Sequence, residues 1–280
     1  MPESASPRAH VTHRHFPAAR PCTILNPEVR MPEWLLAGGA GLIAGAALLL
    51  GSVIAWFVDV PRRVVAAVMA FGSGVLISAL TFELVDEALT TGGLAATVIG
   101  FAVGAVTYVG LNIVLARFGA RHRKRSGHQQ SGLDGDGAGG AIAIGALLDG
   151  VPESMVLGLS VLVGGGVSLP MFVAVFISNV PEGLSSTAGW KRAGRGPGYV
   201  FGIWGGIAVA SGLAALAGYL LLDGAPPATM AVVNALAAGA ILAMITDTMI
   251  PEAFEDAALY SGLIAAAGFL AAFSLHAARG

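Results

Sequence analysis

Charged residues are scarce in this sequence. Of its 280 residues only 11% are Asp, Glu, Lys or Arg, whereas 55% are hydrophobic and 40 are glycine. A soluble globular domain carries about 25% charged residues, so the composition excludes an ordinary water-soluble protein and predicts an integral membrane protein. The net charge of −2 provides no basic surface for DNA or RNA, which excludes nucleic acid as a partner.

Cysteine is almost absent as well. The single residue Cys22 excludes an intrachain disulfide and a thiolate metal cluster. It lies in residues 1–30, which hold five prolines and three histidines and lack the continuous apolar core of a signal peptide. We predict a disordered N-terminal tail over 1–30, followed by a membrane domain over 31–280. Met31 is an alternative start, in which case the tail is not translated.

Long charge-free windows divide the rest of the chain into membrane spans. Two further apolar stretches lie between Ala138 and Trp190, divided by the glycines at 164–166. Together they predict an all-α integral membrane protein with eight transmembrane helices and one long basic loop at 118–137. The six charge-free windows are Trp34–Val58, Val64–Phe82, Leu94–Ala116, Gly198–Leu222, Gly224–Thr246 and Ala257–Ala278.

Lys and Arg are distributed unevenly among the predicted connections. They follow spans one, three and five, and none follows spans two, four, six or seven. Cytoplasmic loops carry the excess of Lys and Arg. The odd-numbered loops are therefore expected in the cytoplasm, which leaves both termini outside a cell membrane.

Spans four and five contain acidic residues, although no Lys or Arg lies inside any predicted span to neutralise them. They are Asp149, Glu153 and Glu182. A charged group at the centre of a membrane helix costs about 2.5–3.5 kcal/mol. Protonation, water in a cavity or a bound cation could offset this cost.

The local sequences favour the cation. A Val-Pro-Glu core occurs twice, at 151–153 and 180–182. Asp149 stands four residues before Glu153, and Ser178 stands four before Glu182, so each pair shares a helix face. Each proline leaves a backbone carbonyl without its helical partner. Because the two spans run antiparallel, we expect these oxygens, with Asn179 beside them, to converge near the bilayer midplane. The alternative is that the prolines are ordinary kinks and the acids are protonated, hydrogen-bonded groups.

With these motifs the chain resembles the ZIP (Zrt/Irt-like) family of divalent-metal transporters over residues 33–278. Eight spans, a basic loop after span three and paired Pro-Glu motifs in spans four and five are typical of that family. FGSGVLISALTFELVDEA (71–88) and AAGAILAMITDTMIPEA (237–253) resemble its spans two and seven and align with each other at an offset of 165 residues. The resemblance implies an inverted repeat of spans one to three on spans six to eight, around spans four and five.

The chain departs from the family at the site itself. Family members usually begin these motifs with His-Asn in span four and with His or Gln in span five, whereas this chain has Asp149-Gly150 and Ser178-Asn179. Ala214 stands where span six often carries a glutamate, so the family's second metal position is expected to be absent or weak. The expected metal ligands are Asp149, Glu153, Ser178, Asn179 and Glu182.

Acidic residues at the ends of two other spans predict a pathway. Glu83 and Glu87 share a face near the outer end of span two, where they would concentrate cations. Asp247 and Glu252 lie toward the cytoplasmic end of span seven. The alternative for such end residues is a solvated helix terminus.

These patterns predict a secondary or facilitative transporter that carries zinc, iron or manganese toward the cytoplasm, and not an enzyme. Two alternatives stay open, an intramembrane metalloenzyme and a metal sensor that does not transport. The partners expected are metal ions and the lipid bilayer, with a homodimer as an open option. The divalent metal is the transported substrate, and no organic cofactor is expected.

The all-oxygen ligand set predicts a weaker preference for zinc than in relatives with histidine, because carboxylates favour harder cations such as Mn²⁺, Fe²⁺ or Mg²⁺. The double variant Asp149→His, Ser178→His should shift selectivity toward zinc. Competition among Zn²⁺, Mn²⁺, Fe²⁺ and Mg²⁺ in an uptake assay measures the shift. Strong zinc selectivity in the unaltered protein would show that ligands outside the motifs dominate.

Overall fold

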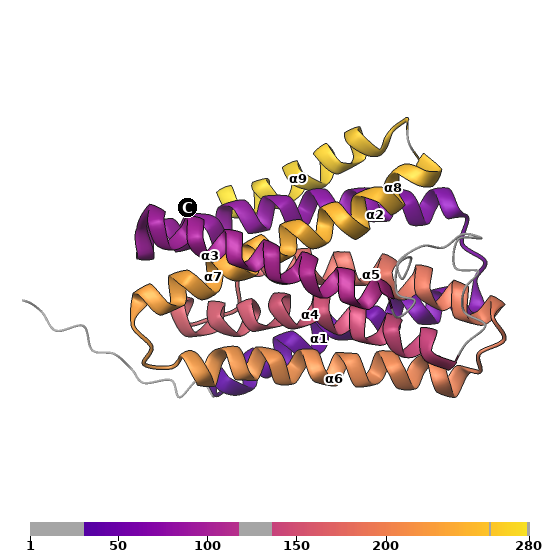
Figure 1. Ribbon diagram of the computed structural model, residues 1–280, viewed down its shortest axis with the longest axis horizontal. Coiled ribbons are helices and arrows are strands. Elements are labelled where there is room, and N and C mark those ends of the chain that lie inside the picture. Colours follow the sequence, from indigo (N-terminus) through magenta and orange to yellow (C-terminus); the bar gives the residue numbers. More distant parts are fainter. Residues whose placement is uncertain (1–30, 118–135, 258, 279–280) are drawn as a thin grey trace, which may run out of the picture. The chain divides into compact units, whose positions relative to one another are not determined.

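The computed structural model describes the backbone of residues 31–117, 136–257 and 259–278, and their side chains except those of 136–142 and 255–257. Within these ranges the chain is helical and contains no strand, which confirms the all-α class (Figure 1). The predicted tail at 1–30 and most of the predicted loop at 118–137 lie outside the described residues. The helices are α1 (Glu33–Phe57), α2 (Arg62–Ala79), η1 (Leu80–Val85), α3 (Asp86–Leu115), α4 (Asp136–Gly164), α5 (Leu169–Arg192), α6 (Pro197–Leu222), α7 (Pro227–Met244), η4 (Ile245–Met249), α8 (Ile250–Ala257) and α9 (Ser261–Ala277).

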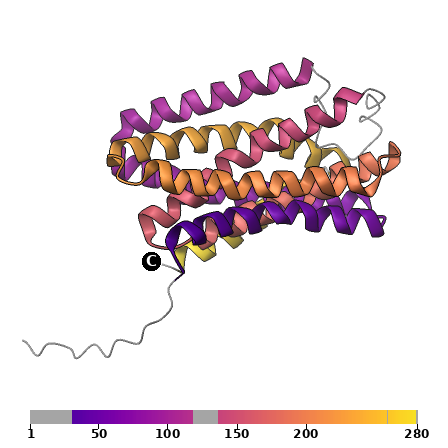
Figure 2. The ribbon, with the colours of Figure 1, turned by 90° about the horizontal axis from the view of Figure 1, so that it is seen from below.

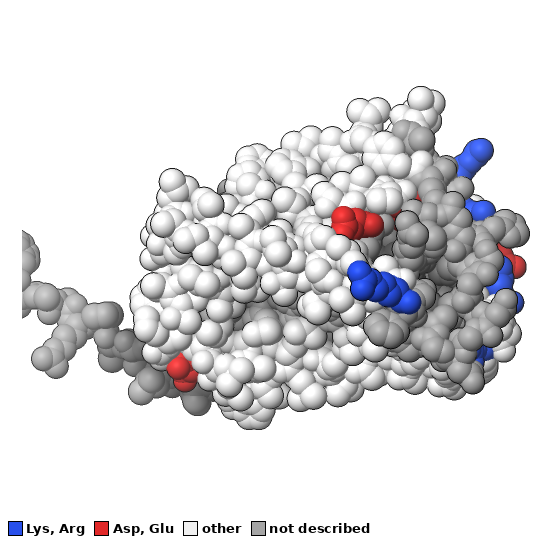
Figure 3. Space-filling model, in the orientation of Figure 1, with Lys and Arg blue, Asp and Glu red and all other residues white. Residues whose placement is uncertain are grey.

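Five of the helical segments are long and apolar enough to cross a membrane, which indicates a membrane protein. Large apolar side chains such as Val106 and Leu221 are about three-quarters exposed, at 73% and 75%. The face shown in Figure 3 is mostly uncharged between its two ends. An apolar exterior of this kind suits lipid rather than water. The five segments are Glu33–Phe57, Arg62–Leu115, Ala143–Gly164, Pro197–Leu222 and Pro227–Phe254.

The segment Arg62–Leu115 is a helical hairpin rather than one straight helix. Gly93 has φ 75° and ψ 173°, a conformation that residues with a side chain rarely adopt and that breaks the helix. Figure 1 shows α2 and the main part of α3 running in opposite directions on either side of this break. The break at Gly93 lies between the charge-free windows that end at Phe82 and begin at Leu94, and Glu83 and Glu87 belong to the helical segment before it, as predicted.

Each long helix packs most closely against one or two others. α1 contacts α5 and α6, α3 contacts α7, α2 contacts α9, and α4 contacts α6. Figures 1 and 2 show α1 and α6 side by side in both views. The main apolar core contains Leu76, Leu157 and Ile241, from α2, α4 and α7. This arrangement decides which helices surround the acidic residues.

Glycines set the close approach of two helix pairs. A Cβ atom added at Gly104 of α3 would collide with the Leu236 carbonyl oxygen of α7, and one added at Gly239 of α7 would collide with that of Phe101 of α3. Gly74 of α2 and Gly268 of α9 make the corresponding reciprocal pair. Small residues of this kind let membrane helices pack backbone against backbone.

Two π-helical turns interrupt otherwise α-helical segments. η1 spans Leu80–Val85 between α2 and α3, and η4 spans Ile245–Met249 between α7 and α8. π-turns inside α-helices occur often at functional sites. η1 carries Glu83 and η4 carries Asp247, two residues of the predicted pathway.

Replacing Gly104 with Ala should destabilise the protein by about 1–3 kcal/mol, because the new methyl group must displace the backbone of α7. Thermal unfolding in detergent measures the loss. Gly110→Ala is the matched control on the same helix, since nothing lies within 4 Å of its added Cβ, and it should leave stability unchanged or slightly raised. Equal effects of the two substitutions would contradict the close packing of α3 on α7.

Candidate functional site

Two acidic residues in the middle of α4 are buried. Asp149 and Glu153 are 3% and 2% exposed and stand one turn apart on the same helix face. The Tyr108 hydroxyl of α3 donates a hydrogen bond of 2.6 Å to Oδ1 of Asp149. Pro152 lies inside the helix between them. A short bond from a buried phenol orients the Asp149 carboxyl and stabilises it away from water.

The three predicted ligands of α5 are buried too. Ser178, Asn179 and Glu182 are 5%, 5% and 6% exposed. The Asn179 amide donates a 2.9 Å hydrogen bond through Nδ2 to the carbonyl oxygen of Ala44 in α1. The Ser178 hydroxyl donates to the Val175 carbonyl at 2.9 Å. Asn179 therefore ties α5 to α1, and its amide oxygen is not used in that bond.

The two helices that carry these acids pack mainly on different partners. α4 packs mainly on α6 and α5 mainly on α1, so α4 and α5 have little direct contact. Throughout the described part of the chain, no group of three or more His, Cys, Asp or Glu side chains is positioned to hold a metal ion. The convergence of Asp149, Glu153 and Glu182 on one cation thus stays a prediction.

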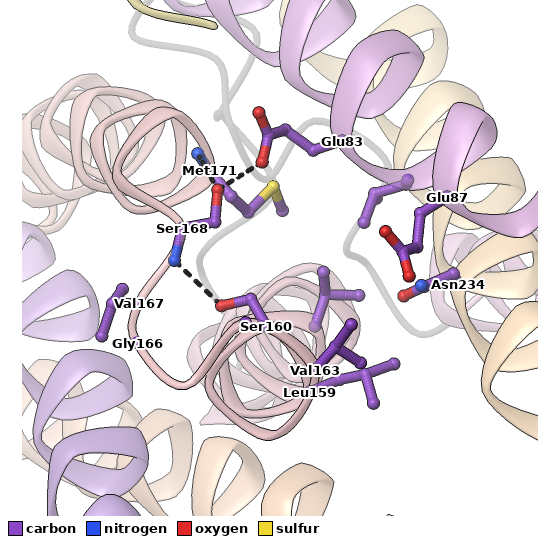
Figure 4. A pocket seen from close by; sticks show the side chains of 13 residues that line it. Glu83, Glu87, Leu159, Ser160, Val163, Gly166, Val167, Ser168, Met171 and Asn234 are labelled. Atoms are coloured by element: carbon purple, nitrogen blue, oxygen red, sulfur yellow. Dashed lines mark hydrogen bonds between the residues drawn. The ribbon is translucent and has the colours of Figure 1, made fainter. Parts of the chain in front are cut away.

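Glu83 and Glu87, predicted to attract cations, line one cavity of about 410 Å³ (Figure 4). The cavity lies where η1 and the start of α3 face the end of α4 and the start of α5. Ser160 and Ser168 add polar groups, and the Ser160 hydroxyl accepts a 3.1 Å hydrogen bond from the backbone N–H of Ser168. The sequence predicted that both glutamates share one helix face, and in the structure both line the same cavity.

A further polar side chain of this cavity comes from α7. Asn234 is 4% exposed and lines the cavity. Figure 4 shows it beside Glu87. A buried amide is costly unless a protein group, water or a ligand satisfies it. The cavity is therefore lined by two carboxylates, two hydroxyls and an amide, and together these groups can bind a polar ligand.

Apolar side chains line the cavity on its inner side, toward the buried acids. Leu84, Val156 and Met171 line the cavity and are 1–3% exposed. Glu153 stands three residues before Val156 and seven before Ser160, on the same face of α4. The buried carboxylate thus lies about one turn deeper along α4 than the wall of the cavity.

Glu83 joins three segments that are distant in the sequence. Its Oε1 lies 2.8 Å from Nδ1 of His276 in α9, and its Oε2 accepts a hydrogen bond from the Ser168 hydroxyl. The His276 ring also stacks on Phe82, with 5.4 Å between ring centroids. These contacts fix the Glu83 carboxylate at the edge of the cavity.

The two residues predicted for the inner pathway lie in different surroundings. Asp247 is exposed, and its Oδ2 accepts a 3.2 Å hydrogen bond from the Asn112 amide of α3. Glu252 is buried at 4% exposure. Neither of them lines the cavity that Glu83 and Glu87 share.

Sequence reasoning missed Tyr108, Asn234 and Ser168. The signal for the first two was present, because a phenol or an amide inside a predicted span needs a polar partner or a wet cavity. Ser168 is the N-cap residue of α5, and a Ser two residues before Pro170 is a local signal for that role. Its hydrogen bond to the distant Glu83 had no signal in the sequence.

Comparison with known families and with curated proteins found no family model and no curated protein that matches this sequence. The resemblance to the ZIP family stays an expectation that rests on the motifs in spans two, four, five and seven.

Replacing Tyr108 with Phe should lower the free energy of unfolding by about 1.5–3 kcal/mol, because it removes a buried hydrogen bond to a carboxyl group. Thermal unfolding in detergent measures the change. Tyr219→Phe is the matched control, since its 3.0 Å bond to Glu33 lies at the surface, and it should change stability little. A loss for Tyr108→Phe no greater than that of the control would refute the role of this bond.

Proposed function

We propose that this protein is a ZIP-like transporter that carries divalent metal cations, of the zinc, iron and manganese class, across the membrane. The observation that carries the proposal is the burial of Asp149, Glu153 and Glu182 within helices of an apolar bundle. Ionisable groups at such positions typically belong to ion or proton pathways. The described Lys and Arg residues, by contrast, stand at helix ends.

The acidic cavity supplies a route toward these buried groups. Its carboxylates, Glu83 and Glu87, attract cations, and its neutral oxygen donors can replace part of a cation's hydration shell. Glu153 lies about one turn deeper on the face of α4 that lines the cavity. A cation that passes the apolar side chains of Leu84, Val156 and Met171 would reach this carboxylate next.

Eight membrane crossings are consistent with the helix lengths. Arg62–Leu115 has 54 residues and would extend about 80 Å if straight, far beyond a hydrocarbon core of about 30 Å, so the hairpin at Gly93 crosses twice. α5 has 24 residues and is long enough to cross despite its polar face. α9 has 17 residues and is the shortest crossing helix.

An inverted repeat is supported by contacts that recur at a fixed spacing. η1 begins at Leu80 and η4 at Ile245, 165 residues later. The Gly74 contact with α9 recurs as the Gly239 contact with α3, also 165 residues later. In repeats of this kind the substrate site lies between the halves and one half moves against the other. The carboxylates of α4 and α5 would then converge on the cation in one state of the cycle and separate in another.

The end of the bundle that carries Lys and Arg is proposed to face the cytoplasm. Both termini then lie outside, and the acidic cavity opens to the exterior. Uptake toward the cytoplasm follows from this orientation. Oxygen ligands from Asp149, Ser178 and Glu182 suit Mn²⁺ or Fe²⁺ at least as well as Zn²⁺.

Metal uptake into proteoliposomes tests the proposal. Purified protein should accumulate Mn²⁺, Fe²⁺ or Zn²⁺ in the lumen, and Glu153→Gln or Glu182→Gln should reduce the rate at least tenfold, because each removes a negative charge from the transport path. Glu33→Gln is the matched control at the exposed start of α1 and should leave uptake within twofold of the unaltered protein.

Size-exclusion profiles of each variant separate lost folding from lost transport. Undiminished uptake in both folded variants would contradict the site assignment. Metal binding without accumulation would contradict transport and favour a sensor. Turnover of a membrane substrate that depends on the same acids would favour the metalloenzyme.

A further inference from the structure

A second cavity, of about 570 Å³, lies at the end of the bundle that carries Lys and Arg. It is enclosed by the end of α1, the connection from Val58 to Pro61, the start of α2 and the last two turns of α5. We refer to it as the basic groove. Its volume is in the range of small-molecule sites, and none of the predicted metal-site residues lines it.

Three cationic residues line the basic groove, Arg62, Lys191 and Arg192, against one acidic residue, Asp59. Lys191 Nζ donates a 2.9 Å hydrogen bond to the Trp56 carbonyl and lies 3.8 Å from Asp59, whose side chain is fully exposed. Within the described residues Arg62 has no ion pair or hydrogen bond to its guanidinium. Among the described residues that line the groove, cationic side chains therefore outnumber acidic ones.

The start of α2 adds to this positive field. The helix begins at Arg62 after Pro61, and no side chain caps its first N–H groups. The N-terminus of an 18-residue helix attracts anions through these groups and through the helix dipole. The uncapped terminus and the Arg62 side chain face the same groove.

Part of the lining of the basic groove is apolar. Ala55 and Val65 come from α1 and α2, and Leu184 and Ala188 come from α5. These four residues belong to or pack against one small apolar cluster. A purely ionic ligand would gain no binding free energy from these apolar residues. A molecule with an anionic head and a hydrocarbon tail can contact both the cationic and the apolar residues of the groove.

The position of the groove fits the same kind of molecule. The charged residues seen in Figure 3 gather mainly at the end where α1 and α5 finish and α2 and α6 begin. Lipid headgroups lie at this level beside membrane-spanning helices. A divalent metal would be repelled by three cations, so the groove is electrostatically unsuited to the cation path.

We propose that the basic groove binds one anionic phospholipid, with the phosphate between Arg62, Lys191 and the start of α2, and an acyl chain against Leu184 and Ala188. The bound lipid bridges α1, α2 and α5 at one end of the bundle. This site does not depend on metal transport and would exist equally in a sensor or an enzyme with this fold.

Native mass spectrometry of the purified full chain tests the proposal. The protein is loaded with phosphatidylglycerol or with phosphatidylcholine of the same acyl composition, and one retained phosphatidylglycerol per chain is expected, against little phosphatidylcholine. Arg62→Gln and Lys191→Gln should each weaken retention about fivefold, the value typical of one cation near anionic lipid. Arg63→Gln is the matched control, because it removes the same charge from the adjacent residue, which does not line the groove.

A second variant tests the apolar residues of the groove without changing its charge, and its size-exclusion profile controls for folding defects. Ala188→Phe fills the apolar side of the groove without changing any charge, and it should weaken retention of phosphatidylglycerol at least fivefold while the size-exclusion profile stays unchanged.

Equal weakening by Arg62→Gln and Arg63→Gln would overturn the proposal, because it would show a diffuse surface effect. Full retention in Ala188→Phe would overturn it as well. Displacement of the lipid by millimolar inorganic phosphate or glycerol 3-phosphate would assign the groove to free phosphate compounds instead.

Discussion

A carboxyl group buried inside a bundle of apolar helices is stable only if something there replaces water, and the structure around α4 and α5 depends on this constraint. Asp149 receives the Tyr108 hydroxyl at 2.6 Å. The surrounding helices keep the acids 2–6% exposed. The free energy lost by burying such groups is several kcal/mol each. Selection would retain them only for a task that apolar residues cannot perform, and moving a cation is the task proposed here.

Close helix packing allows these polar groups to be shielded without long side chains. Glycines bring α3 against α7 and α2 against α9, backbone to backbone, and Gly51 and Gly183 do the same for α1 and α5. Each close pair removes lipid from the interface and leaves room nearby for a hydroxyl or an amide. α4 and α5, which carry the buried acids, are packed mainly on different partners, α6 and α1. A moderate shift of one helix pair against another would change the distance between them.

The two cavities illustrate how charge divides the ends of the bundle. Glu83, Glu87 and Asn234 make one cavity attractive to cations, and Arg62 and Lys191 make the other attractive to anions. Electrostatic interactions are weakly screened near a membrane interior, so each cavity favours one sign of ligand strongly. A lipid held in the basic groove would also fix the ends of α1, α2 and α5, which include the helix that carries Glu182.

The sequence by itself determined the features that depend on local spacing. Long apolar windows predicted helices of membrane length and a division between Phe82 and Leu94, and a spacing of four residues placed Asp149 with Glu153 and Ser178 with Glu182 on shared faces. The tertiary structure alone decided which helices become neighbours. The bond from Tyr108 to Asp149, the link from Asn179 to Ala44 and the meeting of Asn234 with Glu87 join residues 41, 135 and 147 positions apart. Such contacts form only when whole helices pack against one another, and the distance to which two backbones can approach decides which helices become neighbours. No local sequence pattern encodes these contacts.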